Sequence, residues 1–94
     1  MKLSLAGMNG RALVAWNLRR LRTERGLSQE RLAADTGVDR AYVSELERGL
    51  GNASVDLLDR LAEVLRAPLS EFFVEPIEGQ ARPEPLPAGR KGGS

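Results

Sequence analysis

The sequence contains neither cysteine nor histidine, and these two absences exclude several kinds of chemistry. Without cysteine there is no disulfide, no thiol nucleophile and no iron–sulfur cluster. Without histidine the chain lacks the usual general base of neutral pH and the most common zinc ligand. We therefore expect no catalytic residue, no metal site and no cofactor. The absence of cysteine also fits a reducing cytosol, so we expect a cytoplasmic protein.

Long apolar runs are missing as well. The apolar stretch near the start, residues 3–6, is far shorter than the core of a signal peptide, and no segment approaches the roughly 20 apolar residues that a membrane helix needs. A chain of 94 residues provides one domain and has little room for a deep catalytic cavity. We therefore expect one small soluble domain that is not an enzyme and does not enter a membrane.

An excess of one charge is also lacking, because the formal net charge is only +1. The charges are nevertheless unevenly distributed. Residues 1–52 carry nine basic and six acidic side chains, whereas residues 53–94 carry five basic and seven acidic ones. This asymmetry is mild enough to arise by chance, but a basic half beside an acidic remainder is also typical of a protein with one phosphate-binding face.

Apolar residues at helical spacing are present through most of the sequence, and no strand-like alternation occurs. Val14, Leu18 and Leu21 recur four and three residues apart, which predicts one amphipathic helix over residues 10–25. The same reasoning predicts four further short helices, over residues 29–35, 40–48, 55–66 and 68–73. The fold class is therefore all-α, with five helices in one domain over residues 10–74.

Capping residues and glycines mark the ends of these helices. Gly26 and Gly49 follow periodic segments and are expected to end them, and Gly37 is expected to supply the positive φ of a turn. The predicted N-caps are Ser28, Asp39 and Ser54. Outside the helices, residues 1–9 form a short arm, and residues 75–94 contain four prolines, four glycines and almost no large apolar side chain. That composition predicts a disordered tail.

The stretch from Gly26 to Gly49 has the organisation of two helices that cross at a tight turn. Ala33 is small where the two helices approach each other, and Val38 fills the angle of the turn. Val43 and Leu46 point inward from the later helix. The side chains left on its outward face are Arg40, Ala41, Ser44 and Glu45.

Several motifs around this stretch occur together in one register. They are Leu18-Arg19-Arg20-Leu21-Arg22, Leu27-Ser28-Gln29, Leu32-Ala33, Gly37 and Ser44-Glu45-Leu46-Glu47-Arg48-Gly49, followed by Asn52 and by a Leu-Leu-x-x-Leu-Ala element at residues 57–62. With these motifs the chain resembles the phage repressor and Cro family of helix-turn-helix regulators, the Xre family, over residues 10–74. The resemblance implies a compact five-helix lambda-repressor-like fold that binds double-stranded DNA, with the third helix in the major groove.

The resemblance places the outward residues of the third helix at the base edges. Chemistry then favours Arg40 for guanine O6 and N7, Ala41 for a thymine methyl group and Glu45 for cytosine N4. The other residues expected at the DNA interface are Ser28, Gln29, Asp39, Tyr42, Ser44, Arg48 and Asn52. An alternative for Glu45 is an ion pair with Arg48 on a solvated helix face.

The resemblance also implies an internal ion pair and a dimer. Arg22 and Glu47 match positions that form a partly buried bridge between the first helix and the end of the third, and the alternative is two solvated charges. The family often dimerises through its last helix, so we expect a homodimer on an inverted-repeat operator. The expected interface residues are Leu69, Phe72 and Phe73, of which at least one phenylalanine is expected in the core.

Two features of the first helix have more than one interpretation. Four arginines in its second half are either a phosphate-binding run or, as we favour, solvated and paired side chains; they are Arg19, Arg20, Arg22 and Arg25. Trp16 lies opposite the core stripe, where a large aromatic side chain is usually covered. Its cover is either a second subunit or the arm, and the arm residues suited to this are Leu3, Leu5 and Met8. A simply exposed Trp16 is the alternative.

The leading interpretation is a sequence-specific transcriptional regulator, which includes phage repressors, restriction–modification controllers and antitoxins without separating them. Because no long sensor segment follows the helices, we expect no small-molecule ligand. The alternative is a protein-interaction module that kept the fold and lost DNA binding. It is favoured by the low net charge, by the acidic Glu45, and by Leu50 and Gly51, which stand where the family often has basic residues.

Overall fold

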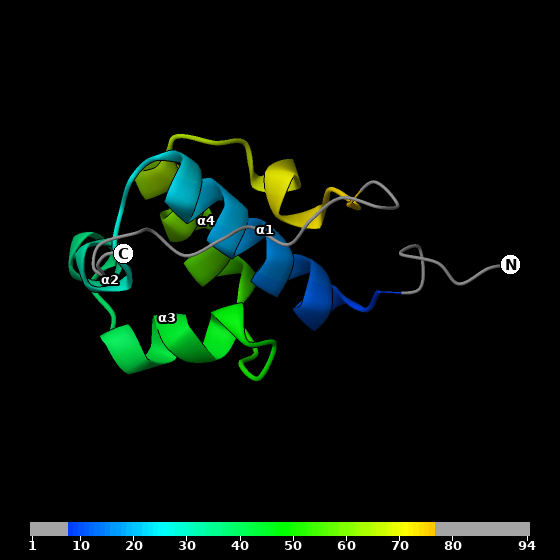
Figure 1. Cartoon of the computed structure of the whole chain (residues 1–94), viewed down its shortest axis with the longest axis horizontal. Coiled ribbons are helices and arrows are strands. Elements are labelled where there is room, and N and C mark those ends of the chain that lie inside the picture. The colour runs from blue at the N-terminus through cyan, green and yellow to red at the C-terminus, as the bar shows by residue number, and fades with distance from the viewer. Residues whose placement is uncertain (1–7, 77–94) are drawn as a thin grey trace, which may run out of the picture.

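The computed structural model describes residues 8–76, and within them it contains helices and no strands. The elements are α1 (Gly10–Glu24), α2 (Gln29–Thr36), α3 (Arg40–Glu47), α4 (Val55–Leu65) and the 3₁₀ helix η2 (Leu69–Phe73). α1 runs through the middle of the molecule, with α3 along one edge, α2 across one end and α4 behind α1 (Figure 1). Residues 1–7 of the expected arm and residues 77–94 of the expected tail lie outside the described residues.

The predicted helix boundaries are within one residue of those observed, but the fifth element is different in kind. Residues 68–73 were expected to form a helix like the others, whereas Leu69–Phe73 is a 3₁₀ helix that starts after Pro68. Its Glu71 N–H donates to Pro68 O at 2.9 Å, an i to i+3 bond. A segment of only five residues is too short to offset the cost of nucleating an α-helix, so the tighter turn is favoured. The all-α class is correct, with four α-helices plus this 3₁₀ turn.

Side-chain caps fix where three of the helices begin. Ser28 Oγ accepts from Arg31 N and Ser54 Oγ accepts from Leu57 N, each at 3.0 Å, as predicted for N-caps. The expectation for Asp39 is wrong in part, because it occupies the N-cap position of α3 without forming a side-chain capping bond. Its carboxylate stays exposed beside the positive end of the helix dipole. α1 has a cap that the sequence analysis missed, Asn9, whose Oδ1 accepts from Ala12 N at 2.9 Å.

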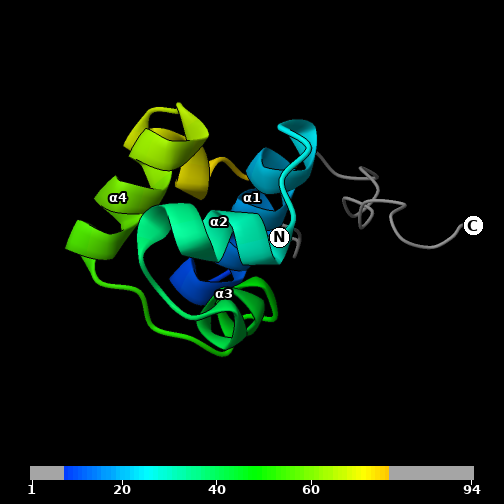
Figure 2. The same cartoon turned by 90° about the vertical axis from the view of Figure 1, so that its left-hand side faces the viewer.

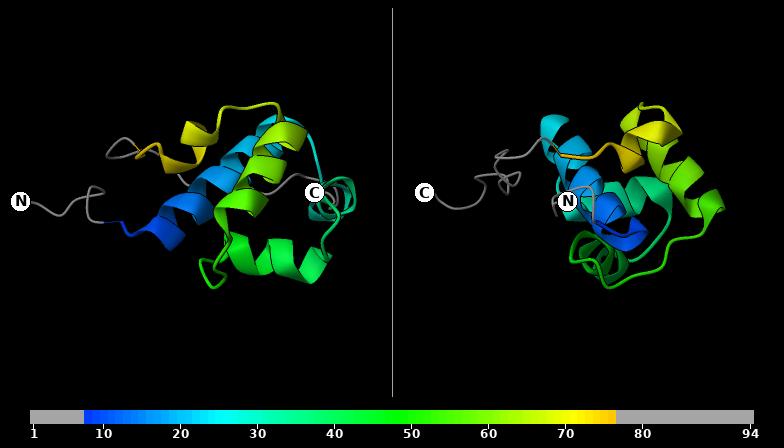
Figure 3. Two further views of the ribbon diagram at one scale, coloured as in Figure 1. Left: turned by 180° about the vertical axis from the view of Figure 1, so that it is seen from behind. Right: turned by 90° about the vertical axis from the view of Figure 1, so that its right-hand side faces the viewer.

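The core lies between α1 and the other helices. The predicted stripe of α1, Val14, Leu18 and Leu21, is buried as expected. Viewed from two other sides, η2 and α3 pack directly against α1, while α2 lies against α3 and α4 (Figures 2 and 3). Phe72 from η2 is completely buried in the same cluster. The apolar face of each helix therefore contributes to one continuous core.

A buried polar side chain, that of Asn17, ties the end of the domain to α1. Its Nδ2 lies 2.9 Å from three carbonyl oxygens, those of Leu13, Phe72 and Val74. Its Oδ1 accepts from Arg20 Nε at 3.1 Å. A buried polar side chain is tolerated where it is hydrogen-bonded. Here the amide of Asn17 satisfies the carbonyl groups of Phe72 and Val74, at the end of η2 and just after it. The ordered packing continues to Pro76, which is also buried.

The turn between α2 and α3 depends on one glycine. Gly37 has φ 86° and ψ 30°, and its N–H donates to Ala33 O at 2.8 Å. The next residue, Val38, also donates its N–H to Ala33 O, at 3.0 Å. This pattern ends α2 and sets the direction in which α3 leaves the turn.

Gly37→Ala should lower the free energy of unfolding by about 1–2 kcal/mol, because an L side chain is strained at this positive φ. Gly10→Ala is the matched control, since Gly10 lies at the start of α1, has no positive φ and has open space where a Cβ would be. It should leave stability unchanged or slightly higher. Urea unfolding followed by circular dichroism measures both changes, and equal stabilities for the two variants would contradict this account of the turn.

Candidate nucleic-acid interface

α3 presents one polar face to solvent and one apolar face to the core. Val43 is fully buried and Leu46 nearly so, and both pack against the other helices. On the opposite side Arg40, Ala41 and Glu45 are exposed, and Ser44 is half-buried between the two faces. α3 lies at the lower edge of the molecule in Figure 1, with no other described helix beyond it. The arrangement therefore leaves the outward face of α3 accessible to a binding partner.

The carboxylate of Glu47 is buried at the end of α3 and receives donors from two other helices. Arg22 Nε lies 2.5 Å from Oε2 and Arg22 Nη2 lies 2.9 Å from Oε1, so the guanidinium binds both oxygens. The two side chains are 5% and 1% exposed. Arg22 Nη1 also donates to Leu27 O at 2.8 Å. The ion pair between α1 and α3 is present in the structure, more deeply buried than the resemblance implied.

Gln29 at the start of α2 is oriented by the same carboxylate. Its Nε2 donates to Glu47 Oε1 at 3.1 Å, and the residue is only partly buried. The neighbouring N-cap, Ser28, is exposed. The first turn of α2 therefore begins with an exposed cap, Ser28, beside the side chain of Gln29, which Glu47 holds in place.

The remaining residues expected at the interface surround the end of α3. Tyr42 is half-buried, and its Oη donates to Asn52 O at 3.4 Å, which links α3 to the loop before α4. Asn52 and Arg48 are exposed. Among the ion pairs of residues 8–76 there is none between Glu45 and Arg48, so the pairing offered as an alternative for Glu45 is absent. Both side chains are left to solvent or to a partner.

Three of the four arginines late in α1 hold the fold together. Arg20 Nη2 lies 2.9 Å from Glu71 Oε1, Arg22 binds Glu47, and Arg25 donates its Nε–H to Leu65 O. The interpretation as paired side chains is correct for these three. Arg19 is also paired, but more loosely, because its Nε lies 3.5 Å from Glu47 Oε1 without forming a hydrogen bond.

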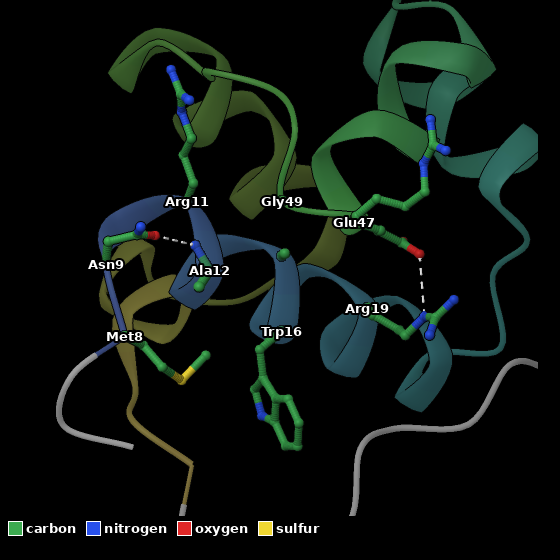
Figure 4. Close-up of a pocket in the computed structure, with 10 residues that line it drawn as sticks. Met8, Asn9, Arg11, Ala12, Trp16, Arg19, Glu47 and Gly49 are labelled. Atoms are coloured by element: carbon green, nitrogen blue, oxygen red, sulfur yellow. Dashed lines mark hydrogen bonds and ion pairs between the residues drawn. The ribbon is translucent and has the colours of Figure 1, made fainter. Parts of the chain in front are cut away.

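The aromatic residues divide between core and surface. Phe72 is 0% exposed whereas Phe73 is 45% exposed, so one phenylalanine is in the core as expected and only the other is accessible to a partner. Leu69 is half-buried. Trp16 is also half-buried, and it lines a pocket together with Met8 (Figure 4). The other arm residues expected to cover it, Leu3 and Leu5, lie outside the described residues.

Residues 8–76 contain neither a membrane-spanning helix nor a cluster of metal ligands. No helix there is long and apolar enough to cross a membrane. No group of acidic side chains in that part of the chain is arranged to hold a metal ion.

An exposed polar helix that follows a tight glycine turn, with its partner helix fixed beneath it, defines a helix-turn-helix module. The chain belongs to the helix-turn-helix family HTH_3, of the Xre/Cro-C1 type, which matches residues 18–72. The family consists of transcriptional regulators and not of enzymes. The class predicted from the motifs is therefore confirmed.

Three similar proteins illustrate the relationship. A hypothetical transcription factor from Neisseria meningitidis serogroup B is 37% identical over 68 residues, which cover 72% of this chain and 64% of that protein. The crystal structure of the hypothetical transcription factor NHTF from Neisseria matches with a TM-score of 0.71 at 32% identity, over 84% of this chain and 88% of that one. The restriction-modification controller protein C.AhdI from Aeromonas hydrophila matches with a TM-score of 0.65 at 43% identity, over 67% of this chain and 96% of that one.

Glu47→Ala should lower the free energy of unfolding by about 3–5 kcal/mol, because it leaves the buried guanidinium of Arg22 uncompensated. Adding Arg22→Met should recover part of that loss, since the second change removes the buried charge. Asp35→Ala is the control: the ion pair of Arg31 and Asp35 spans 2.9 Å but its side chains are 68% and 39% exposed, so about 0–1 kcal/mol is expected. Urea denaturation of the wild type, Glu47→Ala, Arg22→Met, the double variant and Asp35→Ala gives the values, and strictly additive losses for Arg22 and Glu47 would rule out the coupling.

Proposed function

We propose that this protein is a cytoplasmic, sequence-specific transcriptional regulator that binds double-stranded DNA as a homodimer, with α3 in the major groove. The observation that carries the proposal is the division of α3 into a buried apolar face and an exposed face with Arg40, Ala41 and Glu45. The major groove of B-DNA is about 12 Å wide and admits an α-helix, and its base edges have distinct donors and acceptors.

The chemistry of the outward face supports specific contacts. Arg40 has the planar donors that pair with guanine O6 and N7, and it forms no ion pair with another described residue. Ala41 suits a thymine methyl group, and Glu45 can accept from cytosine N4. Ser44, half-buried beside them, has a hydroxyl that can donate or accept.

Phosphate contacts would position α3 on either side. The first turn of α2 provides backbone N–H groups with Ser28, and Gln29 beside it is held by Glu47. On the other side Tyr42 and Asn52 lie together, with Arg48 nearby at the end of α3. Asp39 at the N-cap of α3 is acidic, so it suits a cytosine amino group better than a phosphate. The naming of C.AhdI as a restriction-modification controller supports a role in gene control for this chain too.

A second copy of the chain is proposed to bind at an apolar pocket. The pocket has a volume of about 530 Å³ and lies between α1, α4 and η2; its apolar lining includes Val14, Leu46, Val55, Leu58 and Phe73. Val55 is 65% and Phe73 45% exposed, which is unusual for large apolar side chains grouped together. The interface would use Phe73 with Val55, since Phe72 is buried within the protomer.

DNA selection tests the main proposal. An electrophoretic assay against a random oligonucleotide pool should enrich an inverted repeat whose half-sites are about 10 bp apart. Arg40→Ala should then cost about 1–3 kcal/mol at one base pair and relax the preference there. Arg60→Ala on α4 is the control, because Arg60 is exposed and lies on another helix. If no sequence is enriched at low salt, the alternative of a protein-interaction module replaces this proposal.

Sedimentation equilibrium tests the dimer. Phe73→Ser should raise the dimer dissociation constant by about 30-fold or more, because a central aromatic side chain contributes about 2 kcal/mol or more to an interface. Leu50→Ser is the matched control, since Leu50 is 63% exposed but does not line the apolar pocket. An equal shift for both variants would place the interface elsewhere.

A further inference from the structure

A second pocket, of about 600 Å³, lies along the outer face of α1 where the end of α3 approaches it (Figure 4). Arg11, Trp16 and Arg19 line it from α1, and Glu47 and Arg48 line it from α3. The function proposed above does not use Trp16 or Arg19 of this pocket, whereas Arg11 also lines the apolar pocket proposed for a second copy. We refer to it as the arginine trough.

The arginine trough carries an excess of positive charge. It contains three guanidinium groups and one carboxylate, and that carboxylate already binds Arg22 through both oxygens. Arg11 and Arg48 are exposed and form no ion pair with another residue of the described range 8–76. Arg19 Nε is buried without a hydrogen bond, 3.5 Å from Glu47 Oε1. Arg19 is therefore only weakly paired, to a carboxylate that Arg22 already neutralises, and the trough keeps a net positive charge.

The other arginines near the end of α1 are bound to acceptors within the fold. Arg20, Arg22 and Arg25 all lie against acceptors on later elements. The arginines left with unused donors on α1 are Arg11 and Arg19, and both line the arginine trough. Arg20, Arg22 and Arg25 are therefore committed to the fold, whereas Arg11 has no acidic partner among residues 8–76 and Arg19 has only a long ion pair with Glu47.

The arginine trough is continuous with the proposed DNA-binding face. Ala41, Ser44 and Arg48 are spaced three and four residues apart, so they lie on the same side of α3, and Arg48 is the C-cap of that helix. Gln29, from the first turn of α2, donates to Glu47 on the floor of the trough. A duplex that occupies the outward face of α3 would therefore have its backbone close to the trough.

We propose that the arginine trough binds the sugar–phosphate backbone of the DNA, so that α1 provides a phosphate contact surface through Arg11 and Arg19. This inference rests on the DNA binding proposed above. Arg11 and Arg19 are eight residues apart, about 12 Å along the helix, and they lie at different ends of the view in Figure 4. A single small anion cannot contact both, whereas one DNA strand carries a charge every ~3.4 Å of its axis.

The trough also explains how the chain would bind a polyanion with few basic residues after α3. Leu50 and Gly51 follow Gly49 and provide no positive charge to the loop. Arg11 and Arg19 supply that charge from a neighbouring helix. Such contacts are independent of base sequence and strengthen all complexes equally.

The salt dependence of binding tests the inference. Fluorescence anisotropy with the full-length protein and the selected duplex gives the slope of log K against log salt for the wild type, Arg11→Gln, Arg19→Gln and the double variant. Each lost phosphate contact should make the slope shallower by about 0.9, and the base preference should remain that of the wild type. Arg60→Gln on α4 removes the same charge outside the trough and should leave the slope unchanged. If Arg19→Gln alters the thermal unfolding temperature, Arg11→Gln alone is decisive, provided that sedimentation equilibrium gives it the dimer dissociation constant of the wild type, because exposed Arg11 also lines the apolar pocket.

Two outcomes overturn the inference. The first is a slope for the double variant that equals that of Arg60→Gln. The second is saturable binding of inorganic phosphate to the free protein, seen in the fluorescence of Trp16, the only tryptophan, and lost in Arg11→Gln; the trough would then serve a free anion. If the wild type binds no DNA in a salt-dependent way, the proposed function itself fails, and this result is distinct from the other two.

Discussion

The buried carboxylate of Glu47 connects the three helices on which the interface is built. Moving such a charge out of water costs several kcal/mol, and only well-placed partners offset that cost. Arg22 on α1 binds both carboxylate oxygens, and Gln29 in the first turn of α2 donates its side-chain amide to one of them. Because both donors converge on one group at the end of α3, none of the three helices can shift without leaving a buried charge unsatisfied. The pose of α3 therefore follows from electrostatics as well as from packing.

The other side of α1 is fastened in a different way. Asn17 holds the backbone after η2, and Arg20 holds Glu71 through its carboxylate and its carbonyl. Phe72 then fills the core from the same segment. These contacts let a short 3₁₀ turn close the domain where a full helix would need more residues. The neighbouring Phe73 is turned outward by the same geometry, which gives the protomer an apolar surface beside α4.

α1 thus serves the fold with one set of polar side chains and, as we propose, the DNA with another. The arginines that meet a carboxylate or a carbonyl become structural. Arg11, which pairs with no described residue, and Arg19, which approaches Glu47 without a hydrogen bond, keep donors for a partner. The division has a functional consequence: phosphate affinity can come from α1 while base discrimination stays with Arg40, Ala41 and Glu45 on α3.

The sequence alone determined the helices, their capping serines and the outward face of α3, because these depend on interactions between residues a few positions apart. The helical periodicity also places Asn17 on the stripe of Val14, Leu18 and Leu21. Because Asn17 is polar, the apolar pattern did not predict that it is buried. Tertiary structure decided the rest. The packing of the helices decides which phenylalanine enters the core and which arginines find acceptors. It also decides whether Glu45 pairs with Arg48. For Arg22 and Asn17 the partners lie 25 and 55 residues away in sequence. Local spacing carries no information about such distances, since they are set only when the helices pack around a shared core.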